Sequence, residues 1–242
     1  MQTNKELYES HAVVGKYAAN TTRVRSLNNA EKILIDRFDI KNKKVLVIGC
    51  GVGRVPANLL LYGNQVVGVD RSEGMLQAAR EAFPQSDFPK LSFVKAEAVD
   101  LSSIEDGAFD VVIFPMNSID YIETYALREQ GIHEAKKKLK IGGLLVFSSH
   151  NKTGYLFSPK VKMSDRSLKA FTGGYHYHQE SVVGGGYIFK GDPCFVIADT
   201  ERITGMKFQG FIADTRNKLD RLFAKRLWLA KWWFPYIVYV FK

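Results

Sequence analysis

Cysteines and long apolar segments are scarce in this sequence. Two cysteines among 242 residues, Cys50 and Cys194, provide neither a disulfide framework nor a set of metal ligands. No apolar run approaches the roughly 20 residues of a membrane-spanning helix. The segment Met1–Ser10 is polar and lacks the apolar part of a signal peptide. We therefore expect a cytoplasmic protein that holds no metal and is neither secreted nor membrane-spanning.

Acidic residues are outnumbered by basic ones, and the net charge is +9. This excess permits an anionic partner without identifying one. It is concentrated between Arg216 and Lys231, where six basic residues accompany a single acid, Asp220, and so supply five of the nine net charges. Apolar residues recur there at helical spacing, and Trp232–Phe234 follow. Such a helix suits peripheral contact with an anionic membrane, at its inner face, or with a lipid-linked substrate. Packing on a sheet through its apolar residues is the interpretation that we favour.

A glycine-rich turn, Gly49–Gly53, organises the rest of the chain. The apolar, β-branched run Lys43–Ile48 before it has the composition of a strand buried on both faces. A predicted helix and a second buried strand, Gln65–Val69, follow. Asp70 stands at the carboxyl end of that strand, where an acid suits a bond to a ribose hydroxyl. The pattern therefore predicts a nucleotide-binding βαβ unit.

The spacing of the glycines distinguishes between nucleotides. A dinucleotide fingerprint requires a small residue three positions after the second glycine, and the chain has Arg54 there. Gly49-x-Gly51-x-Gly53 instead resembles motif I of the class I S-adenosylmethionine-dependent methyltransferases. The resemblance implies that the turn passes beneath the methionine part of this cofactor, with Cys50 and the three glycines in contact with it.

Later segments resemble the same family in the same order. Asp70-Arg71, followed by Met75, resembles motif II. The predicted strand Leu91–Lys95 leads to Ala96-Glu97-Ala98, which resembles the adenine-binding segment with Glu97 in place of the usual Asp. The resemblance implies cofactor contacts for the residues Arg71, Met75, Glu97 and Ala98. Met75 is equally suited to a core position. For Glu97 the adenine contact is favoured over a solvated position in the loop.

The fourth predicted strand, Val111–Phe114, is followed by Pro115 and a polar segment. Because ligands bind at the carboxyl ends of strands in an open α/β sheet, Pro115 and Asn117 are predicted to contact the cofactor. The side chains expected near the transferred methyl group are Asn117, Ser118, Asp120 and Tyr121. Asp120 is equally suited to capping the helix that follows.

The next helix and strand end at a candidate catalytic residue. A helix is predicted over Glu123–Lys140, with apolar positions that include Ala126 and Ile132. The fifth strand, Leu144–Ser148, is followed by His150. A hydroxyl acceptor gains from a general base, and His150 is the first candidate for that role, with Asp120 second. The transfer itself requires mainly alignment of the acceptor with the methyl group.

Two regions flank this core. Residues 1–40 are predicted to form lid helices, in which Tyr17 and Arg25 either meet the cofactor's carboxylate or are ordinary surface residues. Residues 151–195 form a predicted insertion on the acceptor side. His176 and His178 within it lack an identifiable carboxylate partner, so we expect no metal site.

The resemblance implies a single domain over residues 1–242. Its fold is an α/β, Rossmann-like three-layer sandwich whose seven-stranded, mostly parallel sheet ends on an antiparallel strand, with Lys207–Asp214 and Tyr236–Phe241 as the last two strands.

The expected activity is S-adenosylmethionine-dependent methyl transfer to oxygen or nitrogen. A sugar hydroxyl of a bacterial saccharide ranks first, because residues 117–121 and 148–151 resemble surface-polysaccharide methyltransferases. A small metabolite ranks second. Nucleic acid ranks third, since no RNA-binding module is recognisable. A non-catalytic cofactor-binding subunit is the alternative outside the enzymes.

Overall fold

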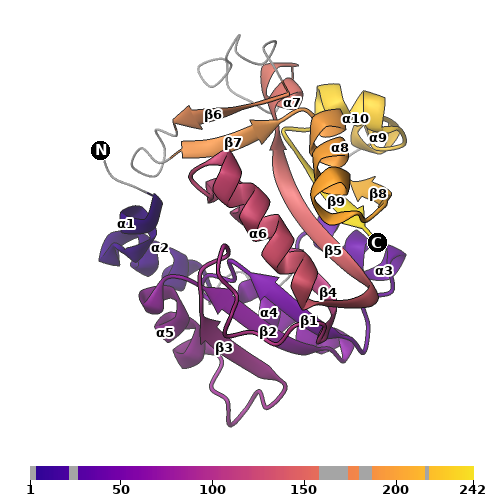
Figure 1. The fold of residues 1–242 in the computed structure, drawn as a ribbon. Helices are drawn as coiled ribbons and strands as arrows, with labels where there is room; N and C mark the ends of the chain where they lie inside the picture. Colours follow the sequence, from indigo (N-terminus) through magenta and orange to yellow (C-terminus); the bar gives the residue numbers. More distant parts are fainter. Residues whose placement is uncertain (1–3, 22–26, 158–173, 180–186, 216–217) are drawn as a thin grey trace.

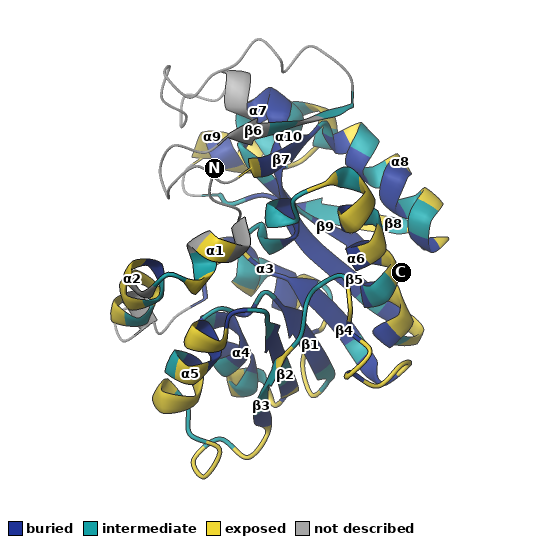
Figure 2. Cartoon of the chain, turned by 60° about the vertical axis from the view of Figure 1, so that its left-hand side comes forward, coloured by how far each residue is buried: buried dark blue, intermediate teal, exposed yellow. Residues whose placement is uncertain are grey.

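The computed structural model describes residues 4–21, 27–157, 174–179, 187–215 and 218–242. Its strands form one nine-stranded sheet with helices on both faces (Figure 1). The central strands are mostly buried, whereas α2 and α5 expose their outer sides (Figure 2). The predicted three-layer α/β sandwich is therefore confirmed. The helices are α1 (Asn4–Glu9), α2 (His11–Thr21), α3 (Asn29–Arg37), α4 (Arg54–Leu59), α5 (Glu73–Ala82), α6 (Tyr125–Lys138), α7 (Lys152–Phe157), α8 (Pro193–Thr204), α9 (Lys218–Phe223) and α10 (Leu227–Trp233), with short 3₁₀ helices η1 (Leu60–Tyr62) and η2 (Ser118–Tyr121).

Five parallel strands form the core of the sheet in the order β3-β2-β1-β4-β5. They are β1 (Lys44–Ile48), β2 (Gln65–Asp70), β3 (Leu91–Lys95), β4 (Phe109–Phe114) and β5 (Leu139–Asn151). Because the strands are parallel, their carboxyl ends all lie at one edge of the sheet. The glycine turn, Asp70, Pro115 and His150 are therefore brought to that same edge.

The C-terminal strands close the sheet as predicted. β9 (Tyr236–Phe241) pairs antiparallel with β5, and β8 (Phe208–Ile212) pairs antiparallel with β9. These two strands and the five parallel ones are the seven strands expected from the sequence. The mostly parallel sheet with an antiparallel last strand is confirmed.

Two further strands were not predicted. β6 (Tyr175–Gln179) and β7 (Tyr187–Gly191) form an antiparallel pair, and β7 pairs in parallel with His150 and Asn151 at the end of β5. Both lie within the predicted insertion at residues 151–195. β5 extends beyond Ser148, and its carboxyl end provides the edge that β7 occupies. The division into lid, core and insertion stays a prediction.

Alternate residues of the buried strands pack on opposite helical layers, as the period of a strand requires. Ile48 belongs to the apolar cluster that includes Ile132 of α6. Its neighbour Val47 belongs to the cluster that includes Leu34 of α3. This explains why β1 is apolar at successive positions. Within the described residues, no helix combines the length and apolar character needed to cross a membrane.

Candidate functional site

A cleft of about 1210 Å³ lies at the carboxyl ends of β1, β2 and β4, beside α1 and α2. Most of the predicted cofactor residues line it, and these are Tyr17, Gly49, Cys50, Gly51, Asp70, Arg71, Met75, Glu97, Ala98, Pro115 and Asn117. Gly53 ends the glycine turn and is followed directly by α4. Arg25 lies outside the described residues. The parallel sheet therefore brings these separate segments to one cavity.

The glycine turn adopts a conformation that other residues rarely reach. Gly49 and Gly51 have φ angles of 74° and 53°. A β-carbon on Gly49 would lie 2.6 Å from the Ser118 β-carbon, so side chains are excluded there. A β-carbon on Gly51 would meet no described heavy atom within 4 Å, because its backbone faces the cleft. A ligand can therefore approach the Gly51 backbone closely.

Asp70 connects this turn to the end of β2. Its Oδ2 accepts a hydrogen bond from the Gly51 N–H at 2.8 Å, and its Oδ1 accepts one from the Ser72 N–H at 3.0 Å. Burial raises the pKa of Asp70, although the two backbone donors oppose this shift. Each carboxylate oxygen can accept a second hydrogen bond. Asp70 can therefore hold the turn and still accept a donor from the cleft.

Cys50 and Met75 line the cleft with atoms that are also part of the protein interior. The Cys50 thiol is buried and lies 3.6 Å from the Gly51 carbonyl oxygen, and burial raises its pKa. Met75 is buried and packs with Val13 of α2 and with Val52. Met75 therefore lies in an apolar cluster of the interior and also lines the cleft. A core position and a position beside the cofactor are compatible for this residue.

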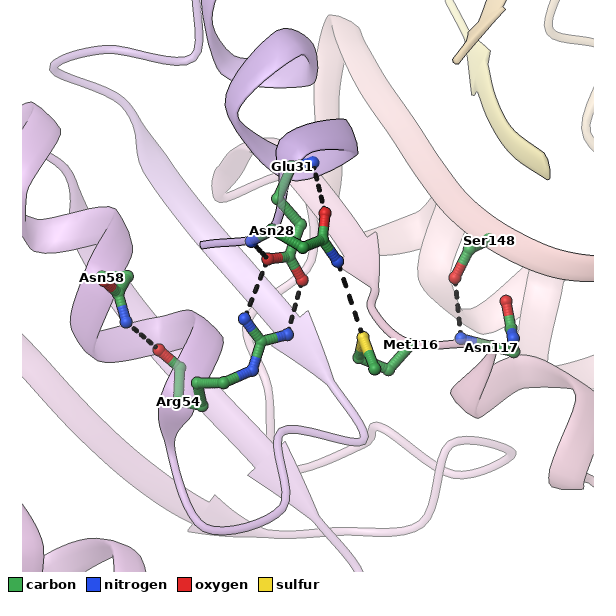
Figure 3. Close-up of polar contacts among 7 residues, drawn as sticks. All are labelled: Asn28, Glu31, Arg54, Asn58, Met116, Asn117 and Ser148. Atoms are coloured by element: carbon green, nitrogen blue, oxygen red, sulfur yellow. Dashed lines mark hydrogen bonds and ion pairs between the residues drawn. The ribbon is translucent and has the colours of Figure 1, made fainter. Parts of the chain in front are cut away.

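The segment after β4 is strained. Met116 and Asn117 have φ angles of 50° and 59°, which cost about 1–3 kcal/mol for each non-glycine residue. The Asn117 N–H donates to Ser148 Oγ at 2.7 Å (Figure 3), and Ser118 Oγ donates to the Ile48 carbonyl at 3.0 Å. These bonds hold the strained turn against β5 and β1. Met116 is 62% exposed and lines the cleft.

Arg54, which departs from the dinucleotide fingerprint, closes the rim of the cleft. Its two terminal nitrogens donate to the two carboxylate oxygens of Glu31 at 2.8 and 2.6 Å (Figure 3). Glu31 and Asn28 form a reciprocal capping box at the start of α3, and Asn28 Nδ2 lies 3.8 Å from Met116 Sδ. This network joins α3 and α4 to the strained turn. It was not predicted, although Asn28-x-x-Glu31 is a capping signature visible in the sequence.

His150 and Asp120 form a buried pair behind the cleft wall. His150 Nδ1 lies 2.8 Å from Asp120 Oδ2, which also accepts the His150 backbone N–H at 2.6 Å. Ser149 Oγ donates to Asp120 Oδ1 at 2.8 Å. Asp120 is 0% and His150 7% exposed, and neither is among the described residues that line the cleft. His150 Nε2 lies 3.3 Å from Nδ2 of Asn117, which separates the ring from the cavity.

Asp120 does not cap the following helix, so that alternative is wrong. Thr124 is the N-cap of α6, and its Oγ1 accepts the Leu127 N–H at 3.3 Å. Asp120 lies within η2 and points its carboxylate towards β5 instead. Its contacts within the protein identify it as a residue that positions His150.

A buried arginine beside this pair was missed. Arg128 of α6 is fully buried, its Nε lies 4.0 Å from Asp120 Oδ1, and its guanidinium lies 4.1 Å from the Phe189 ring centroid. The predicted apolar position Ala126 is exposed, and Arg128 takes its place on the buried face with Ile132. The carboxylate and the aromatic ring make this burial tolerable. The sequence alone does not show that Phe189, 61 positions later, packs on this arginine.

Aromatic side chains form the other wall of the cleft. The Tyr8 ring lies 5.5 Å from the Tyr121 ring, edge to face, and 6.3 Å from the Tyr17 ring. Burial, together with the two neighbouring tyrosines, raises the pKa of Tyr8, so it stays neutral. Tyr121 also lies 6.4 Å from the His150 ring. The aromatic wall therefore stands next to the buried pair.

The described part of the chain holds no group of three or more His, Cys, Asp and Glu side chains arranged to bind a metal ion. His176 and His178 lie on β6, and their side chains are outside what the structure describes. The expectation that the chain holds no metal stays a prediction.

Residues 46–147 match the family described as a methyltransferase domain. The chain is similar to the ubiquinone biosynthesis O-methyltransferase of Hydrogenovibrio crunogenus, at 27% identity over 143 residues, covering 59% of this chain and 57% of that protein. It is also similar to the demethylmenaquinone methyltransferase of Clavibacter sepedonicus, at 32% identity over 107 residues, covering 44% and 41%. The chain thus spans about half the length of these curated relatives.

Solved structures of methyltransferases share the fold of this chain. The 1,6-didemethyltoxoflavin-N1-methyltransferase of Burkholderia thailandensis, solved with 1,6-didemethyltoxoflavin and S-adenosylhomocysteine, superposes with a TM-score of 0.62. The match covers 95% of this chain and 86% of that one, at 13% sequence identity. At this identity the likeness establishes the fold alone.

Proposed function

We propose that this chain, which has the class I S-adenosylmethionine-dependent methyltransferase fold and carries a methyltransferase domain at residues 46–147, methylates an oxygen or nitrogen of a small molecule. One observation carries the proposal. A single cleft joins the glycine turn and Asp70 to an aromatic wall, and the buried His150–Asp120 pair lies behind that wall. A cofactor end and an acceptor end in one cavity are what a group transfer requires.

The residues of the first end fit S-adenosylmethionine. The Gly51 backbone faces the open cleft, and the Asp70 carboxylate can accept ribose hydroxyls. Glu97 lines the same cavity and offers an acceptor for an adenine amino group. When bound, this cofactor supplies an electrophilic methyl group on a sulfonium sulfur.

The second end favours a flat aromatic acceptor. Tyr8, Tyr17 and Tyr121 present rings to the cleft. Aromatic rings stack on planar molecules and gain from burying them. The relatives named above are a ubiquinone biosynthesis O-methyltransferase and a demethylmenaquinone methyltransferase, which supports a quinone-type acceptor, and the first of them supports methylation at oxygen. A sugar hydroxyl, ranked first from the sequence, finds less support in this wall and becomes the second acceptor to test.

For a hydroxyl acceptor, we propose that His150 accepts the proton that the hydroxyl loses. Asp120 Oδ2 holds the Nδ1 side of the ring, so Nε2 is the nitrogen that accepts the proton. Asp120 then stabilises the imidazolium, as a positioning residue. Asn117 stands between Nε2 and the cleft, and rotation of its side chain opens the route. A nitrogen acceptor needs no such base, so its methylation would not depend on His150.

Calorimetry tests the cofactor half of the proposal. S-adenosylmethionine and S-adenosylhomocysteine are expected to bind, and NAD is not. Asp70→Ala should weaken binding by about 1.5–3 kcal/mol, the value of a hydrogen bond to a charged group. Asp87→Ala removes an exposed aspartate outside the cleft and should change nothing. Unchanged affinity in Asp70→Ala would refute the ribose assignment.

Formation of S-adenosylhomocysteine with a panel of acceptors tests the other half. Phenols and quinols are expected to turn over faster than aromatic amines and methyl glycosides. Faster turnover of the glycosides would restore the saccharide interpretation. Cofactor binding without turnover of any acceptor would favour a non-catalytic subunit.

A further inference from the structure

The helices α9 and α10, between β8 and β9, carry a surface that the cleft does not explain (yellow in Figure 1). We call this surface the Trp-basic patch. Its members are all exposed, and they are Lys218, Leu219, Arg221, Leu222, Lys225, Arg226, Trp228 and Trp232. A simple hairpin could join two antiparallel strands in 2–5 residues. The two helices are therefore not needed merely to connect β8 to β9.

Inward-facing side chains of α9 and α10 pack together and hold the two helices in contact. Trp233 Nε1 donates to Asp220 at 2.8 Å, and the Trp233 ring stacks on Phe223 at 4.3 Å. Residues three or four apart share one side of a helix. Trp228 and Trp232 therefore share a side of α10 other than the one that Trp233 uses.

The alternative interpretation, a helix packed on the sheet through its apolar residues, holds in part. Ala230 is buried in the core, and Phe223 and Leu227 pack against it. Leu219 and Leu222 do not take part, because their side chains are 56% and 51% exposed. Trp228 is 66% and Trp232 44% exposed. Four large apolar side chains thus face outward within two short helices.

The charge of the patch has one sign. Between residues 218 and 233 the sequence has a single acid, Asp220, and its side chain is buried and bonded to Trp233. Lys231 is paired with Asp192 at 2.7 Å and does not belong to the patch. Lys218, Arg221, Lys225 and Arg226 therefore give the surface four exposed cations.

We propose that the Trp-basic patch docks on a bilayer surface that contains anionic phospholipids. Tryptophan rings are favoured at the membrane interface, and nearby Lys and Arg are attracted to anionic headgroups. The patch combines both residue types with outward leucines. A second copy of this chain would bring two sets of four cations together, and like charges repel. RNA would use the cations and leave the leucines exposed.

The patch is linked to the proposed active site. Asn151, which follows His150, donates through Nδ2 to the carbonyls of Lys231 and Phe234, both at 2.8 Å. A β-carbon on Gly154 of α7 would lie 1.9 Å from the Phe234 carbonyl oxygen, so the end of α10 lies directly against the start of α7. Docking would therefore hold the carboxyl end of β5 near the bilayer. This orientation matters for an acceptor taken from the membrane, which rests on the proposed function.

Tryptophan fluorescence tests the docking directly, because all three tryptophans of the chain lie in α10. Vesicles that mix phosphatidylglycerol with phosphatidylcholine should shift the emission to shorter wavelength and co-sediment the protein at low salt. Phosphatidylcholine vesicles alone should do neither. Salt at about 0.5 M should release the protein, because the charges are then screened.

Two variants and two controls locate the contact. Lys225→Gln with Arg226→Gln should weaken binding to the mixed vesicles about thirtyfold, the effect of two interfacial cations. Lys32→Gln with Lys136→Gln removes two exposed cations elsewhere and should bind as wild type. Trp228→Ala should weaken binding, whereas Leu61→Ala, at a residue that is 80% exposed and distant in sequence, should not.

Four results would overturn the proposal. The first is no binding to mixed vesicles at low salt. The second is an equal loss of vesicle binding in the Lys225/Arg226 double variant and in the Lys32/Lys136 control. The third is a dimer that Trp228→Ala dissociates. The fourth is RNA binding that removal of Lys225 and Arg226 abolishes while vesicle binding persists. Calorimetry with S-adenosylhomocysteine is independent of these results, so failure of docking and failure of the proposed function can be told apart.

Discussion

Arg128 is the largest side chain in the described chain that is fully buried. Within the described residues none of its guanidinium nitrogens has a hydrogen-bond partner, and Asp120 is the nearby carboxylate at 4.0 Å. Burying either charge is costly, and the loss of one partner leaves the other uncompensated. The two residues therefore depend on each other for stability.

Arg128→Met should lower the free energy of unfolding by up to about 3–5 kcal/mol, because the buried Asp120 carboxylate loses the nearby guanidinium charge and keeps only its hydrogen bonds from Ser149 and His150. Asp120→Asn combined with Arg128→Met should cost less than the sum of the single substitutions. Urea denaturation of the four proteins measures this coupling. Additive losses would show that the 4.0 Å contact contributes nothing to stability.

His150→Ala should lower turnover of a hydroxyl acceptor by about 10²–10⁴ and leave S-adenosylhomocysteine affinity intact, because a general base acts on the acceptor. His133→Ala, an exposed histidine of α6, is the matched control and should retain full turnover. An equal loss of cofactor affinity in His150→Ala would make His150 a structural or cofactor contact. Wild-type turnover would remove it from the mechanism.

Cofactor affinity should depend on pH through Asp70. Burial raises the pKa of this carboxyl above its ordinary 3.8. Ribose hydroxyls donate to the ionised form, so affinity for S-adenosylhomocysteine should fall as the pH decreases towards the raised pKa. In the absence of ligand, the effect of pH on the stability of the folded chain has the opposite sign. The folded chain binds this proton more tightly than the unfolded chain, so the contribution of Asp70 to stability decreases as pH rises between the two pKa values. Calorimetry between pH 4 and 8 should show the decrease in affinity, and Asp70→Asn should abolish it.

At the scale of elements, the parallel strands were the most predictable part. Val45–Ile48 of β1 are apolar at every position because both faces are covered, and such a run is readable from the sequence. β6 and β7 were not readable, because their pairing depends on the free end of β5. The helix expected over Arg216–Ala230 divides into α9 and α10, since Phe223 stacks on Trp233 ten positions later. That contact requires the chain to fold back between the two helices, and no local sequence pattern predicts such a contact.

The residues of the candidate site also divide into those that the sequence predicts and those that it does not. Gly49, Gly51 and Asp70 were identified because backbone conformation and strand ends impose fixed residue types at fixed spacing. Tyr8 was not chosen as a site residue and Arg128 was missed, because their roles depend on partners brought together by the fold. Ordinary residue types at ordinary positions carry no such signal before the tertiary contacts are known.

Asp192 joins α8 and α10 and gives a prediction at this scale. Its Oδ1 caps α8 by accepting the Cys194 N–H at 2.9 Å, and its Oδ2 accepts from Lys231 of α10 at 2.7 Å. Burial would raise the pKa of Asp192, but the hydrogen bonds from Lys231 and Cys194 outweigh it and hold the pKa below 3.8. Its contribution to stability is therefore present above pH 3.8 and is lost as the pH falls through the folded-state pKa.

Asp192→Ala should destabilise the chain by about 1 kcal/mol for the lost cap alone. Asp192→Asn keeps an oxygen for the cap and removes the charge, so it should cost less. Urea denaturation at neutral pH measures both. Repeating it in acid, below the folded-state pKa, should reduce the difference between Asp192→Asn and wild type. A pH-independent difference would show that the Lys231 pair is not responsible.

At the scale of the whole molecule, the cleft lies between a sheet edge and two helices that are attached to it by few contacts. Ser72 Oγ donates to the Tyr8 carbonyl at 3.0 Å, and Val13 packs on Met75. Segments with few buried contacts open at low free-energy cost. We therefore predict that α1 and α2 open and close over the cleft, and that a ligand that contacts both sides favours the closed state.

Hydrogen exchange should reveal this closure. S-adenosylhomocysteine should slow exchange at residues 49–72, which contain the glycine turn, and also at residues 4–21, which contain Tyr8 and Tyr17 of the cleft lining. β8 and β9 lie outside the lining and should exchange at unchanged rates, so they serve as the internal control. In Asp70→Ala, ligand concentrations that saturate the wild type should protect neither segment fully. Protection at 49–72 without protection at 4–21 would mean that α1 and α2 do not close on the ligand, and Tyr17 would then be an ordinary surface residue.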